Sequence, residues 1–76
     1  MSPQPGSKWP AVADAVRARI ADGTMRPGEL ASVRGLAPEF GVGEPVVARA
    51  LAALAREGLV AARPGTGYVV APRGDR

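Results

Sequence analysis

The spacing of apolar residues along this chain changes once, from the period of a helix to the period of a strand. Val12, Val16 and Ile20 recur every four residues, which places them on one face of a helix. The segment 59–70 instead holds two runs of β-prone residues around a Gly-rich centre, the pattern of an antiparallel hairpin. This order predicts a mainly α-helical fold that ends in a small β-hairpin.

Three helices are expected before the hairpin, and each is marked by the residues at its ends. The first begins at Pro10, since proline suits the first turn of a helix, and ends near Gly23. The second follows Ser32, whose hydroxyl can cap a helix, and ends at Gly41. The third spans about 44–57. Because only a tight turn separates the second helix from the third, the predicted architecture is a helix-turn-helix that carries a wing.

Local features of this pattern lead to three further predictions. Pro38 falls inside the second helix, where it removes one backbone hydrogen bond and crowds the carbonyl of Arg34, so a distorted or 3₁₀-like helix is expected. The Pro27–Gly28 pair predicts a turn between the first two helices. Met25 and Leu30 flank this turn and are expected to tuck inward.

Length and composition exclude several classes of function. At 76 residues the chain has room for one small domain, expected over 8–71 between a flexible leader (1–7) and a flexible tail (72–76), and not for a separate ligand-sensing domain. It contains no Cys and no His, so no enzyme, metal site or cofactor is expected. No apolar run approaches the roughly 18 residues of a membrane span, and residues 1–10 lack the basic and apolar regions of a signal peptide, so a cytoplasmic protein is expected.

The charge balance favours a polyanionic partner without demanding one. Ten basic residues against seven acidic ones give a net charge of +3. In winged folds the helix after the tight turn enters the major groove of double-stranded DNA by its N-terminal half. Base contacts would then come from about residues 43–49.

The order and spacing of short motifs resemble the GntR-type winged helix-turn-helix domain of bacterial transcription regulators over about residues 9–71. The matching fragments, in chain order, are VADAV (12–16), RPGELASVRGLA (26–37), FGV (40–42), RALAAL (49–54), REGLV (56–60) and RPGTGYVV (63–70). The resemblance implies a regulator that binds duplex DNA, usually as a dimer held largely by a C-terminal effector domain. The single expected domain holds no small-molecule effector site, and both a homodimer and a partner protein remain open.

The resemblance implies DNA contacts from the second helix and from the wing. Arg34 would contact DNA, and Gly65, Thr66 and Gly67 would bring wing backbone near the minor groove. Arg63, at the base of the wing, is a candidate phosphate contact. The alternative interpretation is that Arg34 is a solvated helix residue and that the glycines serve only the turn.

The third helix departs from the family pattern where base reading is expected. Glu44, Pro45 and Val46 replace the Arg-Thr-Thr of the family, and Ala48 stands where an Arg is usual. Glu44 would repel phosphates, accept from cytosine, or favour the positive end of the helix. Val46 would touch a thymine methyl group or be an ordinary core or surface valine. Arg49 lies on the outward face of this helix, near enough to its front for contact with the DNA groove.

Two functions follow from these observations. The first is a sequence-specific DNA-binding transcription regulator, with the helix 44–57 in the major groove and the wing 63–67 beside it. The alternative is a winged-helix module for protein interaction or dimerisation, in which the same helix presents small apolar residues such as Ala48 and Ala52 to another protein.

Trp9 is expected to pack on the start of the first helix, with a stacking platform for a base as its alternative.

Overall fold

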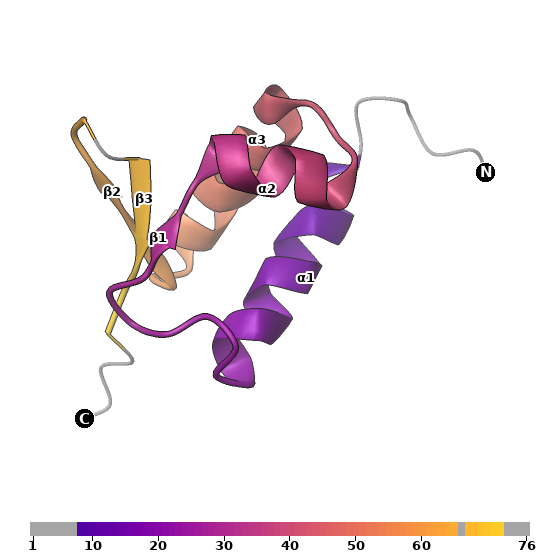
Figure 1. The fold of residues 1–76 in the computed structure, drawn as a ribbon. Coiled ribbons are helices and arrows are strands. Elements are labelled where there is room, and N and C mark those ends of the chain that lie inside the picture. The colour runs from indigo at the N-terminus through magenta and orange to yellow at the C-terminus, as the bar shows by residue number, and fades with distance from the viewer. Residues whose placement is uncertain (1–7, 66, 73–76) are drawn as a thin grey trace.

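The computed structural model describes residues 8–65 and 67–72 and has three helices followed by a hairpin (Figure 1). The helices are α1 (Trp9–Ala21), α2 (Val33–Phe40) and α3 (Glu44–Arg56), and the strands are β1 (Leu30–Ala31), β2 (Val60–Arg63) and β3 (Gly67–Val70). This confirms the predicted fold class. The expected leader, Thr66 and all of the expected tail but Pro72 lie outside the described residues.

Helix α2 is held at both ends by local hydrogen bonds. The Ser32 hydroxyl accepts from the Gly35 N–H at 3.1 Å, as a helix cap does. Gly41 ends the helix with a φ of 69°, a left-handed conformation that favours glycine. The predicted distortion at Pro38 is wrong, because α2 is an α-helix throughout. Pro38 removes a single hydrogen bond, the one to the carbonyl of Arg34. Both residues lie on the exposed side of the helix, so water can donate a hydrogen bond to that carbonyl instead.

Replacing Ser32 by Ala tests how much this cap contributes. We expect Ser32→Ala to lower the free energy of unfolding by about 1 kcal/mol, because one helical N–H loses its acceptor. Urea denaturation followed by circular dichroism measures the change. Ser32→Thr keeps an accepting hydroxyl and should lose much less, so equal losses in the two variants would contradict the capping role.

The sheet has a third strand that the sequence pattern does not predict. Its order is β1-β3-β2 with antiparallel neighbours, so the hairpin of the wing is extended by the short strand β1. Two further backbone hydrogen bonds of 2.8 Å continue the pairing, from the N–H of Gly28 to the carbonyl of Val70 and from the N–H of Val70 to the carbonyl of Glu29. The wing is therefore joined to the segment that leads into α2.

Strand alternation explains which apolar side chains of this region are buried. Ala31 is fully buried, whereas Leu30 lies on the outer face of the sheet opposite Val69 and is 49% exposed. The expectation that Leu30 tucks inward is therefore wrong. Met25 is 6% exposed, which confirms its inward position.

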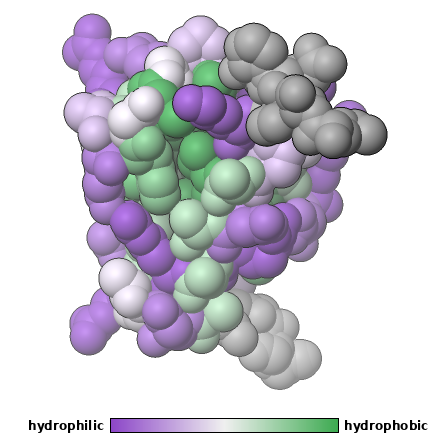
Figure 2. Space-filling view, turned by 90° about the vertical axis from the view of Figure 1, so that its right-hand side faces the viewer, coloured by the Kyte–Doolittle hydropathy of each residue, from purple (hydrophilic) through white to green (hydrophobic). Residues whose placement is uncertain are grey.

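One contiguous core joins the helices to the inner face of the sheet. Figure 1 shows the helices grouped on one side and the sheet on the other. The largest fully buried side chains come from α1, α3 and β3: Val16, Val47, Leu51, Leu54 and Val70. On the face that carries α1, a band of hydrophobic residues reaches the surface between hydrophilic side chains (Figure 2).

Candidate nucleic-acid interface

Three elements begin or end along one edge of the molecule. The start of α2, the start of α3 and the Arg63 end of β2 all lie along the upper edge in Figure 1. The turn after α1 and the last described residue of the chain lie at the opposite edge. The upper edge therefore brings together the helix-turn-helix and the wing, which are distant in sequence.

The start of α3 presents Glu44 and Pro45 to solvent. Gly43 precedes them in an extended conformation and makes no side-chain cap, while its carbonyl accepts from the N–H groups of Val46 and Val47 at 3.1 and 3.3 Å. Glu44 forms no salt bridge with another described residue. Its carboxylate lies in the first helical turn, where the helix dipole favours a negative charge.

Unlike the exposed Glu44 and Pro45, Val46 is half-buried and packs against the core. This supports the interpretation of Val46 as a core residue more than that of a base contact. Ala48, one residue beyond the buried Val47, is exposed. The exposed residues at positions 44, 45 and 48 therefore offer a surface of small or acidic side chains.

Arg49 lies further along α3 and is turned toward the start of α1. Its guanidinium carbon lies 5.3 Å from the centroid of a Trp9 ring, a cation–π distance. Trp9 is half-buried and packs against the core, as predicted. The two residues are far apart in sequence, and no short motif signals their contact.

The arginines of α2 and the wing are exposed at the upper edge. Arg34 is the second residue of α2, and Arg63 is the last residue of β2. Gly65 and Gly67 have φ values of 78° and 112°, which L side chains rarely adopt. The wing backbone thus requires glycine at both positions whether or not DNA is bound. Thr66 lies outside the described residues.

Two other arginines are neutralised by acidic neighbours. Arg17 donates to both carboxylate oxygens of Glu57, at 2.9 and 2.6 Å, and also to Asp14. These hydrogen bonds hold the pKa of the Glu57 carboxyl below its usual range. Arg19 pairs with Glu39. Among residues 8–65 and 67–72, Lys8, Arg26, Arg34 and the arginines of α3 and the wing form no salt bridge, so their positive charge is available to a polyanion.

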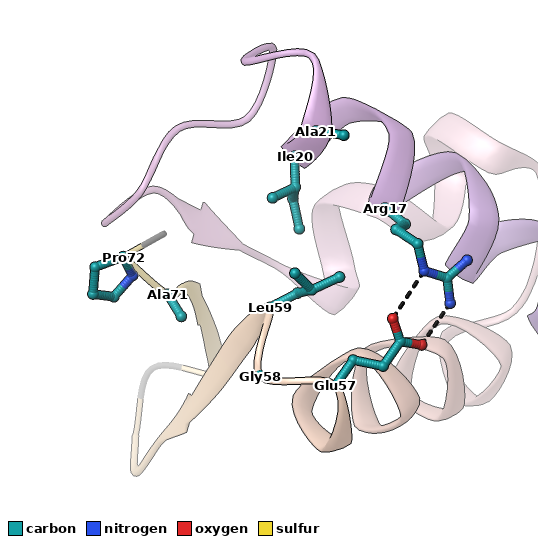
Figure 3. A pocket seen from close by; sticks show the side chains of 8 residues that line it. All are labelled: Arg17, Ile20, Ala21, Glu57, Gly58, Leu59, Ala71 and Pro72. Atoms are coloured by element: carbon teal, nitrogen blue, oxygen red, sulfur yellow. Dashed lines mark hydrogen bonds and ion pairs between the residues drawn. The ribbon is translucent and has the colours of Figure 1, made fainter. Parts of the chain in front are cut away.

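One hollow of the described surface lies away from the upper edge. It measures about 470 Å³ and is lined by Arg17, Ile20, Ala21, Glu57, Gly58, Leu59, Ala71 and Pro72. Figure 3 shows its two charged side chains bonded to each other across the ends of α1 and α3. Because each charge is already satisfied, this hollow offers little to a charged ligand.

Residues 8–65 and 67–72 have neither a membrane-spanning helix nor a cluster of metal-ligand side chains. No described helix has the length and apolarity needed to cross a membrane. Within the same ranges, no three acidic, His or Cys side chains are grouped as metal ligands would be.

Comparison with known proteins identifies the family of this domain. The sequence model for "Bacterial regulatory proteins, gntR family" matches residues 9–70. The HTH-type transcriptional regulator RB1450 of Rhizobium meliloti is 44% identical over 63 residues, which are 82% of this chain and 26% of that protein. This chain thus spans about a quarter of the length of that relative.

Solved structures agree with the sequence match. A GntR family transcriptional regulator from Pseudomonas syringae superposes with a TM-score of 0.80 at 30% identity, over 93% of this chain and 30% of that one. A transcriptional antiterminator from Listeria monocytogenes has the same fold, with a TM-score of 0.77 at 21% identity over all of this chain and 60% of its own. The family match, the order of the elements and the likeness of fold lead to one conclusion: the chain belongs to the GntR family of bacterial transcription regulators.

Proposed function

We propose that this domain binds duplex DNA in a sequence-specific manner and acts as the DNA-reading part of a regulator rather than as an enzyme. The observation that carries the proposal is the meeting of α2, α3 and the wing along one edge that bears unpaired arginines. In this arrangement the N-terminal half of α3 enters the major groove and the wing follows the adjacent backbone.

Each element has a distinct part in the proposed contact. Arg34 meets a phosphate or a base edge from α2, and Arg63 meets a phosphate from the wing. The wing turn brings backbone N–H groups near the minor groove, because glycines leave the backbone unobstructed. The proposed contact residues are Arg34, Glu44, Pro45, Arg49, Arg63, Gly65, Thr66 and Gly67, while the half-buried Val46 is assigned to the core.

Two copies on paired half-sites are part of the proposal. A single module with few base-reading side chains binds weakly, and pairing raises the effective affinity of each copy for its half-site. The acidic and apolar start of α3 weakens the binding of a single copy further, since Glu44 repels the phosphate backbone. Pairing of two copies therefore becomes more important.

Fluorescence anisotropy with labelled duplex pools at two salt concentrations tests the proposal, with light scattering on the same samples for oligomeric state. We expect binding that weakens steeply with salt and enriches a palindromic sequence. Absence of binding at low salt would overturn the proposal.

Removing the wing arginine should weaken binding to all sequences alike. We expect Arg63→Ala to reduce the salt slope by about 0.9, which corresponds to about eightfold in affinity at 0.1 M salt, because one phosphate contact is lost. Anisotropy titrations over a salt series measure both quantities. Arg26→Ala is the matched control, since it removes the same charge from the turn after α1, outside the helix-turn-helix and the wing. Equal slopes for the two variants would contradict the docking.

The exposed side of α3 favours a second candidate function. Pro45, Ala48 and Ala52 are all exposed and small, and such a surface permits close packing against another helix. A protein-interaction module would show concentration-dependent self-association, or association with a partner, without salt-sensitive DNA binding.

A further inference from the structure

A hollow beside α3 shares only Arg49 with the proposed DNA-contact residues. It has a volume of about 300 Å³ and is lined by Trp9, Arg49, Ala52, Ala53 and Arg56. Four of these residues lie on one side of α3, and Trp9 comes from the start of α1. Its volume is at the lower end of the roughly 300–1,000 Å³ of ligand pockets, which suits a small chemical group better than a cofactor.

The charged groups of this hollow all have the same sign. Arg49 and Arg56 are seven residues apart, about 10 Å along the helix axis, and no acidic side chain lines the space between them. Glu57, the acidic neighbour of Arg56, has both carboxylate oxygens occupied by Arg17. Neither Arg49 nor Arg56 has a salt-bridge partner among the described residues. An anion fits this environment.

Trp9 supplies the apolar wall and orients one of the two arginines. Its ring lies 5.3 Å from the Arg49 guanidinium carbon, so the cation is held over the aromatic face. Stacking of this kind uses the face of the guanidinium and leaves the N–H donors on its edge free for a phosphate. Part of the rotamer entropy that Arg49 would lose on binding is thereby already lost in the free protein.

We propose that the Trp9–Arg49–Arg56 hollow binds a backbone phosphate of the DNA strand that flanks α3. This inference rests on the proposed function and deepens it. Arg56 becomes a phosphate-binding residue, and Trp9 is a positioning residue that acts through Arg49. The hollow adds affinity and register without reading bases.

Arg56→Ala tests the phosphate contact. The variant should bind DNA about eightfold more weakly at 0.1 M salt, with a salt slope lower by about 0.9 and an unchanged sequence preference. Arg26→Ala again serves as the matched control. A wild-type affinity and slope for Arg56→Ala would overturn this inference while leaving the proposed function intact. A wild-type protein that binds no DNA at low salt would overturn both.

Trp9→Leu tests the positioning role, since leucine keeps apolar packing and removes the ring. We expect a loss of DNA affinity of about two- to fivefold, in line with an exposed cation–π contact, and no further loss when Arg49→Ala is already present. Circular dichroism checks that both variants are folded. If Trp9→Leu weakens binding equally with and without Arg49, the positioning role is overturned.

Trp9 is the single tryptophan of the chain, so its emission also reports which phosphate source fills the hollow. A change of emission on adding duplex DNA, with none on adding inorganic pyrophosphate at millimolar concentration, supports a DNA phosphate. An equal or larger change with pyrophosphate, together with no effect of DNA, would overturn the proposal in favour of a site for free phosphates.

Discussion

Leu51→Ala is expected to lower the free energy of unfolding by about 2–5 kcal/mol, through lost burial and the cavity left behind. Leu51 is 0% exposed in the middle of α3, within the core shared by the helices and the sheet. Domains of this size have small total stability, so a loss of this magnitude leaves a large unfolded fraction. Urea denaturation followed by circular dichroism measures the change directly.

Leu30→Ala is the matched control for this experiment. It removes the same atoms from the outer face of the sheet, where the side chain is 49% exposed, and should change stability by less than about 1 kcal/mol. Similar losses in the two variants would show that α3 does not pack as described.

Glu44→Arg should strengthen DNA binding more than any other single change at the upper edge. The substitution changes the local charge by two units, at a position where the GntR family pattern has Arg. If each unit acts as one phosphate contact, the salt slope rises by about 1.8 and affinity at 0.1 M salt by about sixtyfold. Anisotropy titrations with the duplex pool over a salt series measure both values.

Glu44→Gln separates the two parts of this effect. It removes the negative charge without adding a positive one, so about eightfold of the gain is expected from it alone. Both variants remove a favourable charge from the first turn of α3, which should slightly lower stability while affinity rises. Unchanged affinity in Glu44→Arg would instead favour a protein-binding role for the exposed side of α3.

The helices and the hairpin of this fold could be predicted because their signals are local. The four-residue spacing in α1 and the cap and terminator of α2 lie within single segments, and the structure has all of them. The strand β1 could not be predicted in this way. It contains two residues, too few for any period, and it exists only because β3, almost forty residues later, pairs with it.

The candidate interface was predictable to a similar extent. The exposure of Arg34, Glu44 and Arg63 follows from their places at helix and strand ends. Their roles in binding stay predictions. The contact between Trp9 and Arg49 depends on how α1 packs against α3, and tertiary packing of that kind cannot be predicted from the local patterns of a single sequence.

The strand β1 also has a mechanical consequence. It leads directly into the cap of α2 on one side and is hydrogen-bonded to the returning strand of the wing on the other. These hydrogen bonds therefore hold the wing in place, and a movement of the wing is coupled to a movement of the start of α2. Amide hydrogens of β3 and of the first turn of α2 should accordingly exchange as one cooperative unit. The proposed DNA contacts from α2 and from the wing would then form together, in a single step.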